Sequence, residues 1–331
     1  MTQAIDLARW GLDRIDVGTV GDRRLDDVIA RLKGEKFVGM VLVAPQELPA
    51  TGARRLPVLV FLGTHSTDPL PFARSAVFAV TRVESGETSF GRAEPWKDPL
   101  PRRQMPPEPG EKAYFSHEQL AYDVGECVPE LPWRAGEVIV RALVLSKATN
   151  AARVKLSPAI DTTDPEVRRF LESARPHDER GPWPPPQPGQ ALPSYVRDAE
   201  TPAPPQTQGL SIIVPRVARV SGEPVVTRGS FTLRLPRGTR VVPVTLLLTG
   251  PASPDPEVIR LRVPVADVFD PDHERPLTHG HFAVDLAGLE GMPRVAQDYS
   301  VWAFAGEHMT GPLPLTLVSD EMLPGATDFP D

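Results

Sequence analysis

Short stretches of apolar and β-branched residues alternate with turn-forming residues along most of the chain. In the first half these stretches occupy residues 37–43, 56–62, 75–83, 138–145 and 152–156. In the second half they occupy residues 210–214, 230–235, 241–248, 258–263, 280–286, 299–304 and 313–318. Short strands separated by turn residues at such spacings are typical of β-sandwiches. The pattern predicts a mainly β protein with two sandwich domains, and residues 86–112 are predicted to form a long loop.

Residues 1–35 have a different pattern, because their apolar residues recur three and four positions apart. One predicted helix carries Ile5, Ala8, Leu12 and Ile15, and a second carries Leu25, Val28, Ile29 and Leu32. Asp22 is placed to cap the second helix, and Gly34 is placed to end it. Each amphipathic helix needs a partner surface. That surface is either the first sandwich or another protein, so the stripe of the second helix is a candidate interaction surface.

Proline is far more frequent than in ordinary domains, with 40 among 331 residues. Twelve prolines fall between Pro158 and Pro205, which predicts a semi-rigid linker with polyproline II geometry. A short helix starting near Asp164 is expected inside it. The predicted organisation is helices over 1–35, a first sandwich over 36–157, a linker over 158–208, a second sandwich over 209–320 and a tail over 321–331.

The two predicted sandwiches share an order of motifs, which indicates an internal duplication. Residues 59–63 and 246–250 are both mostly apolar and end in glycine, and an Asp-Pro pair follows each. Residues 114–115 match 281–282, and each domain closes with two apolar strands joined by a short turn. That closing pattern resembles the last hairpin of immunoglobulin-like and fibronectin-III-like sandwiches. The resemblance is to a fold class, so it implies no activity.

Acidic residues and histidines are concentrated in residues 270–281. His279 and His281 share one face of a strand, and Asp285 follows on that face. Such side chains bind transition metals. A His-x-His followed by a carboxylate is similar to the first metal motif of cupins, although the second cupin motif is not recognisable and His308 is the only later histidine. A divalent transition metal is therefore an alternative to the expectation of no cofactor, in which these histidines only form hydrogen bonds.

Sequence motifs of the common catalytic classes are missing from the chain. There is no Walker loop, dinucleotide fingerprint, His-Glu-x-x-His or Gly-x-Ser-x-Gly motif. Cys127 is the single cysteine, and nearby His117 is a base only if the fold brings the two side chains together. The expectation is a non-enzymatic protein.

Charge and composition narrow the partners further. The net charge of −7 argues against nucleic-acid binding, and no apolar run is long enough to span a membrane. No signal peptide is recognisable, so a cytoplasmic location is expected. Trp96 and Trp133 lie in proline-rich loops and are candidates for an exposed binding surface. The predicted function is a structural or scaffold protein that binds another protein or itself; the alternatives are a metal-binding enzyme or accessory protein and a carbohydrate-binding module.

Overall fold

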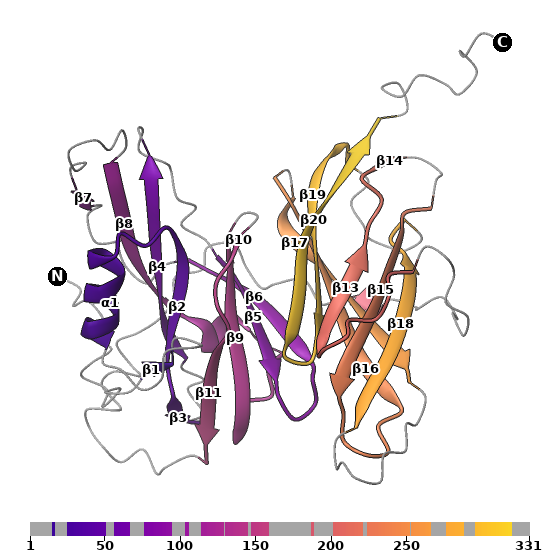
Figure 1. The fold of residues 1–331 in the computed structure, drawn as a ribbon, viewed down its shortest axis with the longest axis horizontal. Coiled ribbons are helices and arrows are strands. Elements are labelled where there is room, and N and C mark those ends of the chain that lie inside the picture. Colours follow the sequence, from indigo (N-terminus) through magenta and orange to yellow (C-terminus); the bar gives the residue numbers. More distant parts are fainter. Residues whose placement is uncertain are drawn as a thin grey trace. The chain divides into compact units, whose positions relative to one another are not determined.

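The computed structural model describes most residues of the predicted sandwiches. The described residues are 15–16, 25–50, 56–66, 76–94, 103–105, 114–128, 130–144, 147–158, 187–188, 201–220, 224–251, 253–265, 276–287 and 295–319. The predicted helix before Ile15, the helix near Asp164, Trp96 and the C-terminal tail lie outside them. The chain divides into two units, Met1–Glu84 with Ser89–Trp183, and Ser85–Thr88 with Pro184–Asp331. Both are built mainly of strands, which confirms the predicted β class (Figure 1).

The described residues of the first unit form two sheets. One has the order β1-β2-β4-β8-β7, formed by β1 (Ile15–Asp16), β2 (Gly39–Pro45), β4 (Pro57–Ser66), β8 (Tyr114–Asp123) and β7 (Arg103–Met105). The other has the order β3-β11-β9-β5-β6, formed by β3 (Glu47–Pro49), β11 (Ala152–Ser157), β9 (Gly136–Val144), β5 (Ala76–Arg82) and β6 (Thr88–Ala93). Strand β10 (Lys147–Ala148) pairs with β9, and β3 is parallel to β11.

The core of the first unit lies between these sheets. Alternate residues of a strand point to one face, so Val58 and Val60 of β4 meet Phe78 and Val80 of β5 in a single cluster. Tyr122 joins them with its ring edge-on to Phe78, at a centroid distance of 5.0 Å. Burial raises the pKa of the Tyr122 phenol, so this side chain stays neutral in the core.

Helix α1 (Leu25–Gly34) covers the outer face of the first sheet (Figure 1). Val28 and Ile29 are buried in a cluster with Phe61 and Phe115, and Leu32 packs against the edge of this cluster. The apolar stripe of the helix therefore packs against its own sandwich, which was one of the two alternatives predicted for it. The side chain of Leu25, also in the predicted stripe, lies outside the described residues.

The prediction for residues 1–35 agrees with the structure at the end of α1 but not at Ile15. Helix α1 ends at Gly34, as its sequence predicts, and Lys36 adopts the left-handed conformation (φ 47°) after it. Ile15 was expected to be helical, but it lies in β1 and pairs antiparallel with Pro45. Strand β1 thus extends the sheet at the edge of β2, and this pairing overrides the helical spacing at Ile15.

Two sheets are also formed by the part of the second unit that the structure describes. One has the order β12-β17-β16-β19-β20-β14, formed by β12 (Gln187–Pro188), β17 (Ser253–Pro264), β16 (Val241–Gly250), β19 (Gln297–Ala305), β20 (His308–Val318) and β14 (Val217–Arg219). The other has the order β13-β15-β18, formed by β13 (Gly209–Ile213), β15 (Val226–Arg234) and β18 (Leu277–Asp285). A second apolar core lies between them.

Two phenylalanine–glycine pairs hold β15 against β18 on the core side. Phe231 lies opposite Gly280, and Gly229 lies opposite Phe282. A Cβ atom added to Gly280 would come within 2.2 Å of the Phe231 ring, and one added to Gly229 would come within 2.3 Å of the Phe282 ring. Each ring therefore covers the glycine of the neighbouring strand, which compensates for the missing side chain.

The strands follow the same order in both units. Strands β2-β4-β8 correspond to β13-β15-β18, and β3-β11-β9-β5-β6 correspond to β14-β20-β19-β16-β17. In each unit a three-residue strand, β3 or β14, pairs in parallel with the last strand. This order corrects one motif match: residues 59–63 lie in β4, whereas 246–250 lie in β16, whose place in the first unit is taken by β5.

The stretch 86–112 was predicted to be a long loop, but it contains β6 and β7. All residues of β6 are buried. Strand β6 lies at the end of its sheet beside β5. Its sequence, Thr-Ser-Phe-Gly-Arg-Ala, has little β character of its own, so the strand depends on its place in the sheet.

Candidate functional site

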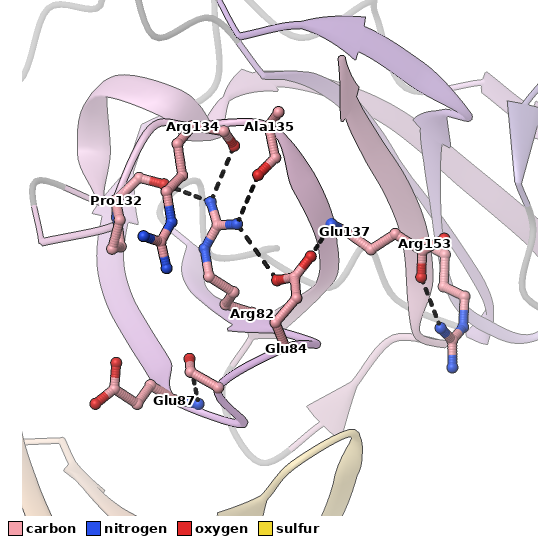
Figure 2. A network of polar contacts seen from close by, with 9 residues as sticks. Arg82, Glu84, Glu87, Pro132, Arg134, Ala135, Glu137 and Arg153 are labelled. Carbon is pink, nitrogen blue, oxygen red and sulfur yellow. Dashed lines mark hydrogen bonds and ion pairs between the residues drawn. The ribbon is translucent and has the colours of Figure 1, made fainter. Parts of the chain in front are cut away.

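The most developed polar network of the described residues surrounds Arg82, at the end of β5 (Figure 2). The side chain of Arg82 is only 2% exposed. Its Nη2 atom donates to the carbonyls of Pro132 and Arg134, at 2.5 and 3.2 Å. Its Nη1 atom donates to the carbonyl of Ala135 and to Glu84 Oε2, both at 3.4 Å. One guanidinium group thus holds three carbonyls of the segment that leads into β9.

Glu84 connects this network to the start of β9. Its Oε1 atom accepts a hydrogen bond from the main-chain N–H of Glu137 at 2.9 Å. Desolvation acts to raise the pKa of Glu84, but the hydrogen bonds from main-chain N–H groups and the charge of Arg82 outweigh it, so the pKa is lowered. Glu84 is therefore a carboxylate near neutral pH, which matches the charge of Arg82.

Gly136 is required where the loop meets β9. Its φ angle is +138°, a region that residues with a side chain rarely adopt. A Cβ atom at this position would lie 2.4 Å from Glu84 Oε1 and 2.7 Å from Arg82 Nη1. A side chain here would force Arg82 and Glu84 apart.

The contacts around Arg82 indicate what the network can do. A guanidinium group has five N–H donors, and four contacts of Arg82 go to protein oxygens. A group held in this way is poorly placed to bind an anionic substrate, and the groups around it are main-chain carbonyls and one carboxylate. The network is a clasp that fixes the connection between β8 and β9.

The second unit holds its corresponding connection with a different side chain. Tyr299, near the start of β19, instead donates its hydroxyl hydrogen to the carbonyl of Val295 at 3.4 Å. In each unit, a buried polar side chain therefore binds one or more carbonyls of the segment that precedes β9 or β19.

A second clasp is repeated in both units with the same hydrogen bonds. Asp123, the last residue of β8, accepts from the N–H groups of Leu56 and Gly125 at 3.0 and 3.1 Å. Asp285, the last residue of β18, accepts from the N–H groups of Val225 and Ala287 at 2.8 and 3.0 Å. Main-chain bonds of 2.9 Å, from Val124 N to Leu56 O and from Leu286 N to Val225 O, accompany them. Asp285 was a candidate metal ligand, and here its carboxylate binds two main-chain N–H groups.

The candidate histidines lie on the outer face of β18. His279 is exposed, and its Nδ1 atom lies 2.9 Å from Thr232 Oγ1. The Thr232 hydroxyl donates its single hydrogen to the Pro205 carbonyl at 2.6 Å. His279 Nδ1 must therefore carry a hydrogen and donate to Thr232. In the neutral ring this leaves the Nε2 lone pair free on the other side, as in metal-binding histidines.

The other proposed ligands are distributed over two sheets. His281 lies on β18 opposite Ser230, on the same face as His279, whereas His308 begins β20 in the other sheet. Among the residues that the structure describes, no three His, Cys, Asp or Glu side chains are grouped closely enough to hold a metal ion. Of the four proposed ligands, His279, His281 and Asp285 share the two-residue period of β18, but the carboxylate of Asp285 accepts from main-chain N–H groups.

Cys127 and His117 are separated by most of β8. His117 is buried and stacks on Phe61, with ring centroids 5.7 Å apart. Cys127 lies in the single-turn helix α2 (Val124–Cys127) beyond the end of β8, and its Sγ atom donates to the Val124 carbonyl at 3.3 Å. The six residue steps from His117 to Asp123 alone span about 20 Å of strand. The two side chains therefore do not form a nucleophile–base pair.

Trp133 lies in the loop that Arg82 holds. It is partly buried and packs against the first core, between the exposed residues Pro132 and Arg134. Because the ring packs against the core, less of its surface is open to a partner protein or a sugar than its position in a proline-rich loop indicated.

No described helix is long and apolar enough to cross a membrane.

Comparison with known proteins adds no function. No protein-family model matches the chain, and no curated protein matches it. Among solved structures, the chain is similar to the N-terminal periplasmic domain of ScsB from Proteus mirabilis, at 8% identity over 85% of this chain and 94% of that one. The TM-score is 0.16, and a likeness at that level carries no argument about this chain.

Proposed function

We propose that this chain is a non-catalytic scaffold protein that binds another protein or a second copy of itself. It would do so through two immunoglobulin-like or fibronectin-III-like sandwiches that arose by internal duplication. The observation that carries the proposal is the strand order repeated in both units, together with the repeated aspartate clasp.

The strand order supports the finer fold assignment. In an immunoglobulin-type sandwich, strands A, B and E share a sheet, while C, F and G form the other with C′ beside C. The strands β13, β15, β16, β17, β18, β19 and β20 fit A, B, C, C′, E, F and G in that order. The hydroxyl bond of Tyr299 near the start of β19 resembles the tyrosine corner of that fold. The corresponding strands of the first unit support the duplication.

The use of buried polar side chains supports a structural role. Arg82 and Asp123 bind main-chain groups of loops, as described above. Asn150 accepts from Leu42 N at 2.8 Å and donates to Leu42 O at 3.1 Å, so its amide takes the place of a main-chain partner for β2. These side chains stabilise the frame of the sandwich. An enzyme would be expected to direct some of them toward a substrate.

The proposal is tested on the full-length chain. Sedimentation measurements at several concentrations report self-association, and cross-linking in the native cells followed by mass spectrometry reports partners. We expect a dimer, or one partner protein that rebinds the purified chain at a fixed stoichiometry. A monomer at all concentrations, with no partner that rebinds after purification, would refute the proposal.

We also propose a second candidate, a metal-binding role for the outer face of β18. The orientation of His279 favours it, because a hydrogen bond at Nδ1 presents the Nε2 lone pair to solvent, with His281 on the same face. Imidazole nitrogens suit divalent zinc, nickel or copper.

Calorimetric titration of the full chain with zinc tests this second candidate. We expect binding to weaken at least tenfold in His279→Gln and in His281→Gln. His308→Gln serves as the matched control, since His308 lies in the other sheet. Binding of less than about 0.1 zinc per chain, or equal loss in the control, would exclude a site on β18.

A further inference from the structure

The last residues of the predicted linker run along the outer face of β15. Ser230 and Thr232, two positions apart on this strand, donate their hydroxyl hydrogens to the carbonyls of Ala203 and Pro205, at 3.0 and 2.6 Å. Two positions further, Arg234 N donates to Gln208 Oε1 at 3.2 Å. We call residues 201–208 the strap. At Gly209 the chain enters β13, which pairs antiparallel with β15.

The spacing of the two partners matches. Two residues of a β-strand span about 6.7 Å, and two residues of polyproline II span about 6.2 Å. A proline-rich segment can therefore place alternate carbonyls opposite alternate strand residues with little distortion. The bonds at Ala203 and Pro205 have this arrangement.

The chemistry of the two partners is also complementary. Pro202, Pro204 and Pro205 have no main-chain N–H group, so this part of the strap offers mainly carbonyl acceptors. Normal strand pairing requires both donors and acceptors, whereas a row of hydroxyl donors matches a segment that offers mainly acceptors. The bond from His279 Nδ1 to Thr232 orients the second hydroxyl toward the strap.

We propose that the outer face of β15 is a docking surface for proline-rich segments that offer mainly carbonyl acceptors, and that its occupant is the strap of the same chain. Docking fixes the end of the linker on the second sandwich. It removes eight residues, about 25 Å in polyproline II geometry, from the length that the linker can span. This docking is independent of whether the chain binds another protein.

Hydrogen exchange of the full chain tests the docking. In Ser230→Ala with Thr232→Val, we expect exchange of the Arg234 amide, which donates to Gln208 of the strap, to accelerate at least tenfold, while exchange of β19 stays unchanged. Thr232→Ser, which keeps the hydroxyl, should retain protection. Ser211→Ala is the matched control, because Ser211 lies opposite Ser230 on the neighbouring strand. If the double variant does not fold, each single variant is measured by the same criterion.

Two results would overturn the proposal. Equal exchange in the hydroxyl variants and in the Ser211 control would show that the hydroxyls do not hold the strap. Protection that falls on dilution would show that the strap comes from a second copy, which contradicts the stated occupant.

A peptide experiment tests recognition separately. The changes Pro202→Gly, Ala203→Ser, Pro204→Gly and Pro205→Ser should vacate the surface. A synthetic peptide of residues 201–208 should then shift NMR signals of β15 and β18, but leave those of the wild-type chain unchanged. A short tether gives a millimolar effective concentration, so absence of shifts at about 10 mM peptide would refute docking.

Discussion

Replacement of Asp123 by alanine should strongly destabilise the first sandwich. Asp123 is buried, and its Oδ1 atom accepts from Leu56 N and Gly125 N. Each buried N–H that loses its partner costs about 1–3 kcal/mol, so the variant should lose about 2–6 kcal/mol. That is a large share of the roughly 5–15 kcal/mol by which a domain is stable. The variant is expected to unfold at clearly lower urea concentration.

Asparagine separates the role of the acceptor from the role of the charge. Asp123→Asn keeps an oxygen at this position but replaces charged hydrogen bonds by neutral ones, which should cost only about 1 kcal/mol per bond. Urea unfolding followed by circular dichroism measures all variants. Asp27→Ala, which removes an exposed carboxylate of α1, is the control and should change stability by at most about 0.5 kcal/mol.

Two outcomes would refute this reasoning. If Asp123→Ala is no more destabilising than Asp27→Ala, the two N–H groups find other partners and the clasp is not needed. If asparagine destabilises as much as alanine, the negative charge matters rather than the hydrogen-bond geometry. Asp285→Ala should repeat the effect in the second unit, because its carboxylate binds the corresponding N–H groups.

Three further changes have definite expected results. Arg82→Met should accelerate hydrogen exchange in the loop that it holds, because three carbonyls lose their donors; unchanged exchange would contradict the clasp. Gly280→Ala should lower the melting temperature by several degrees, because its Cβ would come within 2.2 Å of the Phe231 ring; Gly34→Ala, with open space around it, is the control. The lowered pKa of Glu84 means that its carboxylate stabilises the folded state above its ordinary pKa, and that this contribution disappears as the pH falls through the lowered value. Urea unfolding should therefore show a difference between wild type and Glu84→Gln at pH 7 that vanishes in acid, and a difference that grows in acid would reverse the assigned sign.

Much of the strand pattern was visible in the sequence. The stretches 241–248 and 299–304 lie within β16 and β19, because strands on a buried core carry apolar residues at alternate positions. Strand β8 was not identified, since its outer face carries Phe115 and His117 near α1 while Glu118 and Gln119 interrupt the apolar pattern. A strand covered on its outer face loses the simple alternation of a half-exposed strand.

The candidate sites were less predictable than the strands. The sequence placed His279 and His281 on one face, which follows from the two-residue period of a strand. It gave no sign of Thr232 as the partner of His279, because that contact depends on the register of β15 against β18. Arg82 was not identified either, since its partners are carbonyls fifty or more residues away in the chain.

The sequence by itself determined the β class, the positions of most strands and the end of α1 at Gly34, because local apolar spacing and helix termination are properties of neighbouring residues. Only the tertiary structure decided which strands correspond in the two units. It showed that residues 246–250, in β16, correspond to β5 rather than to residues 59–63 of β4. It also decided that Asp123 and Asp285 have the same role. Both depend on pairing between distant segments, and a short sequence motif does not encode the identity of a distant partner.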